Sequence, residues 1–305
     1  MAMTFAEIEA FVTITRSGGF TRAALLLHLS QPAISRRIEL LEHELGAAVF
    51  ERLPDGIRLT QAGEAFLPYA RQVVTAVEDG KAAVAALDEE AQGTVTLALA
   101  GSLVSTPLTA HLRAFREAYP QVRLLLRTDR SAEVSAQVQQ GDALLGLRYF
   151  TDPSPAIRSL HVMDEPLLVV CAAHSRFVTG APTEPAALLG VPWLIFPFEP
   201  GTPSEALEQQ LLRHGLHGAD RIVIDSLTAQ KRLIEADFGV GLLPASSIEE
   251  ELRLGTVRVL PIAALQTVMP VILIVRRQAY LSRAARLLVR SLAPQADERG
   301  GASHG

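Results

Sequence analysis

The sequence is poor in the features that mark several large classes of protein. It has one cysteine, Cys171, which excludes an internal disulfide and a zinc site built from cysteines. The strongest apolar runs, 166–173 and 268–275, are far shorter than the roughly 18 residues that a membrane-spanning helix needs. The first residues lack the basic start and the long apolar core of a secretory signal. We therefore expect a cytosolic protein.

An excess of charge of one sign is also missing. The chain of 305 residues has 28 basic and 33 acidic residues, a formal net charge of −5, so composition alone does not indicate a nucleic-acid partner. Hydrophobic residues make up 49% and charged residues 20%, which is typical of a globular protein. The length predicts two or three domains of roughly 100–200 residues each. Function must therefore be inferred from local patterns.

Common cofactor and catalytic motifs do not occur. No G-x-G-x-x-G follows the first predicted strand, and no G-x-S-x-G nucleophile elbow is present. The spacing of His214 and His217 permits metal binding on a helix, but Gly215 and Gly218 mark a helix end and favour a surface pair. We therefore expect no cofactor, no metal and no catalytic residues, and we predict that the protein is not an enzyme.

Residues 1–60 do contain an informative pattern, a series of short helical segments. Thr4, Thr21 and Ser30 each precede apolar residues at helical spacing, which predicts three helices with these residues as N-caps. Two short helices joined by a tight turn are typical of a helix-turn-helix, whose second helix enters the major groove of DNA.

The third predicted helix has two different faces. Ile34, Ile38, Leu41 and Leu45 recur at spacings of 4, 3 and 4, which gives one apolar stripe. The N-terminal half of the opposite face is polar. Glutamine can pair bidentately with adenine, and arginine with guanine or phosphate. We therefore predict that DNA is contacted by Ser30, Gln31, Ser35 and Arg36.

A hairpin is predicted after this helix ends at Gly46. Short apolar runs at 49–50 and 57–59 flank the turn Pro54-Asp55-Gly56, which favours two short strands. The arrangement predicts a winged helix-turn-helix. Arg52 and Arg58 would lie in the wing, near the phosphates or the minor groove.

A string of short motifs at fixed spacing runs through this region and beyond it. Its members are Ala23-Ala24, Ser30-Gln31, Ser35-Arg36, Leu41-Glu42, Glu44-Leu45-Gly46, Phe50-Glu51-Arg52 and Leu59-Thr60-Gln61-Ala62-Gly63. A helix-turn-helix alone is a weak signal, whereas this full string is a specific one. It resembles the LysR-type transcriptional regulators, and the length and later layout extend the resemblance over nearly the whole chain.

The resemblance implies an α/β protein with an N-terminal winged helix-turn-helix, a long linker helix and a two-subdomain effector domain like a periplasmic binding protein. The alternation of short apolar runs and helical stretches after residue 93 separately predicts a doubly wound α/β sheet. The expected domains are 1–60 for DNA binding, 61–92 for the linker and dimerisation helix, 93–293 for effector binding (subdomain I 93–164 and 267–293, subdomain II 165–266) and 294–305 as a disordered tail.

The predicted DNA-binding residues also include Thr21, Arg22, Pro32 and Arg37. Pro32 stands where many relatives have a polar residue, which removes one contact. The first 60 residues carry six arginines and seven acidic residues, a balance that disfavours non-specific DNA affinity. Binding would therefore depend on where the arginines lie.

The linker helix carries a heptad-like seam, which favours pairing with a second chain. The alternative is a helix that packs on its own domain. The resemblance favours a homodimer and implies a homotetramer built from two kinds of dimer contact. The seam consists of Phe66, Ala70, Val73, Val77, Gly80, Val84 and Leu87.

Ligands of doubly wound sheets bind beyond the carboxyl ends of strands, near helix N-termini. The resemblance implies that a cleft between the subdomains holds a small effector. The residues at predicted strand ends are Gly101, Ser102, Thr128, Asp129 and Arg148 in the first subdomain, and Phe196, Phe198, Thr202, Asp225 and Ser226 in the second.

Several of these residues have two interpretations. Arg148 could clamp a carboxylate, or it could pair with Asp129 or Asp225. Ser102 could donate to an anionic effector, or it could only cap a helix. Phe196 and its neighbour at 198 could line the pocket or belong to the core.

The leading hypothesis is a transcriptional regulator that binds an interrupted palindrome of double-stranded DNA. Its effector would be small and anionic, with a carboxylate as one candidate, and would alter DNA binding or bending. The alternative is an α/β small-molecule-binding protein or enzyme without DNA binding.

Overall fold

The computed structural model describes residues 3–53, 56–85, 92–105, 107–198, 203–216 and 218–294. The chain forms two compact units. The first holds residues 1–89 with the short segments 140–142 and 279–282, and the second holds the remainder. Among the described residues, no helix is long and apolar enough to cross a membrane. The predicted tail lies outside the described residues from position 295 onward.

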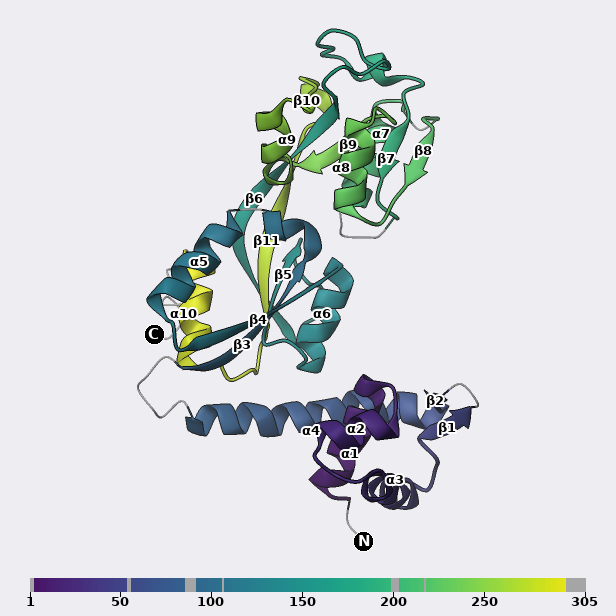
Figure 1. Cartoon of the computed structure of the whole chain (residues 1–305), viewed down its shortest axis with the longest axis vertical. Coiled ribbons are helices and arrows are strands. Elements are labelled where there is room, and N and C mark those ends of the chain that lie inside the picture. Colours follow the sequence, from purple (N-terminus) through teal and green to yellow (C-terminus); the bar gives the residue numbers. More distant parts are fainter. Residues whose placement is uncertain are drawn as a thin grey trace. The chain divides into compact units, whose positions relative to one another are not determined.

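The first unit is a helical bundle with a β-hairpin (Figure 1). The hairpin was predicted, and its strands pair antiparallel, with Phe50 opposite Leu59. Its turn at 54–55 lies outside the described residues. The elements are α1 (Phe5–Ser17), α2 (Phe20–Leu26), α3 (Gln31–Leu45), β1 (Phe50–Leu53), β2 (Gly56–Leu59) and α4 (Gln61–Ala85).

Two of the three predicted N-caps are confirmed. The Thr4 amide donates to the Glu7 carboxylate at 2.9 Å in a capping box, and the Ser30 hydroxyl accepts from the amide of Ala33 at 3.3 Å. The prediction for Thr21 is wrong. The N-cap of α2 is Gly19, two residues earlier than predicted, so Thr21 lies inside the first turn.

The apolar stripe of α3 forms the centre of the first unit. Ile34, Ile38 and Leu41 are buried, and they join a core that includes Phe11 and Phe50, whose ring centroids are 5.2 Å apart. The predicted inward face of the helix is therefore confirmed, and burying these side chains contributes about 1.5–3 kcal/mol each.

Helix α4 begins close to the hairpin. The Thr60 hydroxyl accepts from the Gly63 amide at 3.1 Å and donates to the Ala48 carbonyl at 2.6 Å. A Cβ atom at Gly63 would overlap the Val49 carbonyl oxygen, so only glycine allows this approach.

The predicted seam of α4 divides into two parts. Ala70 is buried and Phe66 packs against the core of the same unit, so this part of the seam serves the chain itself. Val73 and Val84 are exposed. Leu87 lies outside the described residues. The packing of α4 on its own domain, which was the alternative to helix pairing, therefore holds at its N-terminal end.

The second unit contains one large mixed sheet and one small parallel pair of strands. The large sheet has the order β10-β6-β11-β5-β3-β4, with β9 also paired to β6, and the pair is β7-β8. The strands are β3 (Gly93–Ala100), β4 (Val122–Asp129), β5 (Leu145–Tyr149), β6 (Ile157–Ala172), β7 (Trp193–Ile195), β8 (Arg221–Val223), β9 (Gly241–Pro244), β10 (Val257–Val259) and β11 (Thr267–Arg276).

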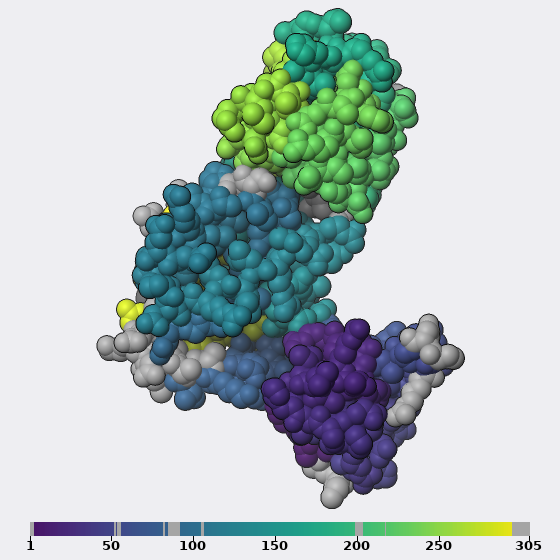
Figure 2. Space-filling model, in the orientation of Figure 1, coloured from purple at the N-terminus to yellow at the C-terminus, as the bar shows by residue number. Residues whose placement is uncertain are grey.

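The doubly wound prediction holds only in part. Strand β3 is parallel to β4 and β5, and β7 is parallel to β8. Strands β6 and β11, however, are antiparallel to each other and run between two lobes, seen as teal and green masses in Figure 2. Strand β6 starts at Ile157, nine residues before the predicted start at 166. Polar residues such as His161 and Asp164 interrupt the apolar pattern in its first half, so the sequence does not indicate a strand there.

Helices cover both faces of the first lobe (Figure 1). Val134 and Val138 of α6 pack against Ile272 and Ile274 of β11. Helices α5 and α10 lie together against the other face. The first lobe comprises β3, β4, β5, α5 (Leu108–Ala118), α6 (Ser131–Gln140) and α10 (Arg283–Leu292); the second comprises β7 to β10, α7 (Pro203–Arg213), α8 (Leu227–Glu235) and α9 (Glu249–Leu254).

Candidate DNA-binding surface and effector pocket

The solvent face of α3 carries the predicted DNA contacts. The Arg36 side chain is 68% exposed, and its guanidinium donates to the Glu39 carboxylate at 3.1 Å. Pro32 and His43 are exposed on the same face. Because Ile34 and its partners hold the opposite face, this row is available to a duplex.

Polar side chains in the first turn of α3 already form hydrogen bonds within the helix. The Gln31 side-chain amide donates to the Ser35 hydroxyl at 3.2 Å, and the Ser30 hydroxyl serves as the N-cap. Gln31 and Ser30 are exposed, whereas Ser35 is half-buried. The Gln31–Ser35 pair would have to open before Gln31 could pair with adenine.

Arg37 differs from the other predicted contacts. It is half-buried, and its guanidinium donates to the carbonyl of Ala6 in α1 at 3.4 Å. Its place on the flank of α3 allows this contact with α1, and its predicted contact with DNA stays a prediction. Thr21 is exposed, and Arg22 is exposed with a weak 3.5 Å contact to the Ser17 carbonyl.

The hairpin presents Arg58 to solvent. Its side chain is 66% exposed and donates to the Glu51 carboxylate across the hairpin at 2.7 Å. The Arg52 backbone pairs with Ile57, but its side chain lies outside the described residues. Both Arg36 and Arg58 therefore have an exposed acidic neighbour.

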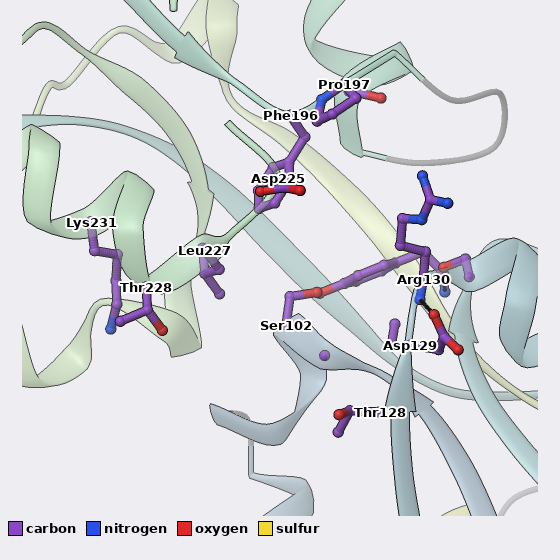
Figure 3. Close-up of a pocket in the computed structure, with 15 residues that line it drawn as sticks. Ser102, Thr128, Asp129, Arg130, Phe196, Pro197, Asp225, Leu227, Thr228 and Lys231 are labelled. Atoms are coloured by element: carbon purple, nitrogen blue, oxygen red, sulfur yellow. Dashed lines mark hydrogen bonds between the residues drawn. The ribbon is translucent and has the colours of Figure 1, made fainter. Parts of the chain in front are cut away.

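The second unit has a cavity of about 420 Å³ between its two lobes. Strands β3, β4 and β5 point their carboxyl ends at it from one lobe, and β7 and β8 do so from the other. Figure 3 shows Phe196 and Asp225 on one side of the open space, with Ser102, Asp129 and Arg130 on the other. The lining residues are Ala100, Gly101, Ser102, Thr128, Asp129, Arg130, Ser131, Tyr149, Phe196, Pro197, Ser204, Asp225, Leu227, Thr228 and Lys231.

Most of the predicted effector residues come together at this cavity. Thr202 lies outside the described residues, and three others are not among the lining residues. The Phe198 side chain is 63% exposed, and the Ser226 hydroxyl caps α8 by accepting from the Ala229 amide. The predicted residues that do line it are Gly101, Ser102, Thr128, Asp129, Phe196 and Asp225.

Arg148 is the third described residue that does not line the cavity. It is 7% exposed, and its guanidinium donates to the Ser135 hydroxyl at 2.6 Å and to the Asp152 carboxylate at 2.8 Å. The predicted partners, Asp129 and Asp225, were therefore wrong. Because its donors are used inside the first lobe, Arg148 does not serve as the carboxylate clamp.

Tyr149, the next residue of β5, was missed and does line the cavity. Its phenol lies 3.1 Å from the Ser102 hydroxyl, and burial raises the pKa of Tyr149 well above its ordinary value. The ring therefore stays protonated. Ser102 is thus more than a helix cap, since its hydroxyl joins a pair on the cavity wall.

Strands β6 and β11 connect the two lobes beside this cavity. Glu165 of β6 is 1% exposed, and its carboxylate accepts from the Ser246 amide at 3.0 Å and from the Ser246 hydroxyl at 2.9 Å. Glu165 pairs with Met269 of β11, and Leu167 pairs with Thr267 two residues further along. Among the described residues there is no group of histidine, cysteine and carboxylate side chains that could hold a metal ion.

Comparisons with known proteins agree on one family. The model described as "LysR substrate binding domain" matches residues 88–297, and "Bacterial regulatory helix-turn-helix protein, lysR family" matches residues 5–64. The regulator TfdS of Cupriavidus pinatubonensis is 31% identical over 252 residues, 80% of this chain and 83% of that protein. The regulator CfxR of Cupriavidus necator is 29% identical over 275 residues, 86% of this chain and 82% of that protein.

A solved structure extends the likeness to the whole architecture. The crystal structure of CbnR, a LysR family transcriptional regulator, has a TM-score of 0.67 and 25% identity. The match covers 96% of this chain and 99% of that one. CbnR has also been solved in full length in a complex with its target DNA.

Proposed function

We propose a function for this chain from one premise: it belongs to the LysR family of transcriptional regulators. It is a DNA-binding regulator with an effector-binding domain, and its relatives are regulators, not enzymes. Residues 1–60 are assigned to DNA binding, 61–92 to the linker and dimerisation helix, and 93–293 to effector binding. The first lobe corresponds to 93–164 and 267–293, and the second to 165–266.

The proposed DNA interface is the exposed face of α3 with the hairpin. Arg36 and Gln31 read base edges, and Arg58 contacts phosphate. The observation that supports this is the separation of α3 into a buried apolar stripe and an exposed polar row. Two copies on one interrupted palindrome make a homodimer the minimal binding unit, and a homotetramer follows if two such dimers join.

The proposed effector site is the cavity between the lobes. The observation that carries this assignment is the convergence of strand carboxyl ends and the starts of α6, α7 and α8 on one cavity. Helix starts expose unpaired amides, so an acidic group such as a carboxylate is favoured there. An effector that binds one arrangement of the lobes more tightly shifts the chain toward it and so changes DNA binding or bending.

A gel-shift titration of the full chain tests this function. DNA from upstream of its own gene and of a divergent neighbour is compared with scrambled DNA at several salt concentrations. We expect selective binding to the natural DNA and an affinity that falls steeply with salt. Equal affinity for scrambled and natural DNA refutes the regulatory function.

A further inference from the structure

The charged side chains that line the cavity are not equivalent. Within the part of the chain that the structure describes, they are Asp129, Arg130, Asp225 and Lys231. A ligand responds to the charges that remain after the protein has neutralised its own. The partners of each group therefore decide what the cavity selects.

Asp129 and Arg130 are satisfied inside the first lobe. One Asp129 oxygen accepts from the Arg130 amide at 3.0 Å, and the other accepts from the Gln137 side chain at 3.1 Å. The Arg130 guanidinium forms an ion pair with Glu133 at 2.7 Å. This corner of the cavity therefore carries one guanidinium that is paired with Glu133, and one carboxylate, Asp129, whose two oxygens already accept N–H donors.

Lys231 is satisfied inside the second lobe. Its ammonium group forms an ion pair with the Glu251 carboxylate at 2.7 Å and donates to the Ser247 carbonyl at 2.8 Å. The side chain is only 18% exposed. Its charge is therefore matched before any ligand arrives.

Asp225 differs from these three groups. No described residue forms a hydrogen bond or ion pair with its carboxylate. Asp225 lies two residues after the end of β8, and Phe196 directly follows the end of β7. The two strands are parallel neighbours, with Ile195 opposite Val223. Both residues line the cavity, and Figure 3 shows both on the same side of the open space. A carboxylate beside an aromatic ring attracts a cation by charge and by cation–π interaction.

The opposite wall offers a hydrogen-bond donor. Ser102 and Tyr149 share one hydrogen bond between their hydroxyls, so one of the two O–H groups is left to donate. Tyr149 is 1% exposed and lies against the cavity. An acceptor such as a carboxylate oxygen fits this wall.

We propose that Asp225 binds a positively charged group of the effector, so that the effector is an amine- or guanidine-bearing acid and not a simple anion. This inference rests on the proposed effector function of the same cavity. The ammonium or guanidinium group lies between Asp225 and Phe196, and the acidic group faces Ser102 and Tyr149. A simple dianion would instead meet the repulsion of an uncompensated carboxylate.

Calorimetric titration of the full-length protein tests the proposal. The probes are the common amino acids, guanidino acids and polyamines, and each one that binds is compared with the analogue that lacks its positively charged group. The variants are Asp225→Asn and Asp220→Asn. Asp220 precedes β8 at the amino end, is exposed and does not line the cavity, so its variant removes the same charge elsewhere.

We expect at least one amine-bearing acid to bind, and its affinity to fall at least tenfold without the amino group. Asp225→Asn should cause a similar loss for the amine-bearing acid and none for the deaminated acid. Asp220→Asn should change neither. The proposal is overturned if no positively charged probe binds, or if Asp225→Asn leaves its affinity unchanged. A gel shift on the same wild-type protein separately tests the regulatory function, so the two failures can be told apart.

Discussion

The substitution Arg36→Ala tests the proposed reading of DNA most directly. Arg36 is 68% exposed, and its ion pair with the 62% exposed Glu39 lies in solvent. Exposed pairs of this kind contribute about 0–1 kcal/mol to folding. The substitution should therefore leave the free energy of unfolding within about 1 kcal/mol of the wild-type value, so a change in DNA binding cannot be ascribed to unfolding.

The expected loss in DNA recognition is larger. A good arginine contact to a guanine edge provides about 1–3 kcal/mol of discrimination, which corresponds to roughly 5- to 150-fold in affinity at 25 °C. Arg36→Ala should lower the affinity for the natural site by this factor while affinity for scrambled DNA changes little.

Arg58→Ala provides the matched control. Arg58 is exposed to a similar extent, 66%, and is also paired with an acidic residue, but it lies in the hairpin. Loss of a phosphate contact weakens binding to all sequences alike and reduces the salt slope by about 1. Competition gel shifts at three salt concentrations measure both quantities.

The reasoning is refuted if Arg36→Ala weakens natural and scrambled DNA by the same factor. That result would give Arg36 a phosphate contact and would move base reading to another part of α3. Glu39→Gln adds a second check, because it frees Arg36 and should maintain or strengthen the affinity for the natural site.

Further predictions concern stability. Gly63→Ala should lower the thermal midpoint, with a cost of about 1–3 kcal/mol from overpacking, whereas Gly80→Ala, with nothing within 4 Å, should be neutral or stabilising. Asp152→Asn leaves the buried Arg148 without a counter-charge and should cost about 3–5 kcal/mol in denaturant unfolding. Since burial raises the pKa of Tyr149, the unfolded chain loses that proton first, so stability should fall as pH rises above 10.0; pH-dependent melts of wild type and Tyr149→Phe would show a smaller fall in the variant.

The DNA-binding half could be predicted closely because its signals are local. The spacing of Ile34, Ile38 and Leu41 fixes the buried face of α3, and Ser30 and Gly46 mark its ends, where the structure has an N-cap hydrogen bond and a left-handed C-cap. The interior of one helix and its two ends lie within 17 residues of sequence, so no long-range contact is needed to place them.

The effector cavity could be predicted only in outline. The rule that ligands lie at strand ends correctly predicted that the end of β5 lies at the cavity. Adjacent residues of a strand, however, point to opposite faces. Tyr149 faces the cavity, whereas Arg148 faces Ser135 of α6 and Asp152. Sequence position alone could not choose between these faces.

Residues contributed by helix starts were also missed. Ser131 and Ser204 lie at the starts of α6 and α7, and Lys231 lies in the second turn of α8. Their place at the cavity depends on how the second lobe is joined to the first through β6 and β11. The one usable signal was serine at a helix start just after a strand, as at Ser131.

Because β6 and β11 are paired with each other, the second lobe is joined to the first through two adjacent strands and could be exchanged as one segment. The chain leaves the first lobe and returns to it along hydrogen-bonded strands, and Leu167 pairs with Thr267 where they enter the second lobe. Paired strands lie only about 5 Å apart. A graft that exchanges residues 168–266 for the same segment of a related regulator would therefore keep both junctions in register. It would replace the cavity wall that holds Phe196 and Asp225 and leave the wall that holds Ser102 and Tyr149 unchanged.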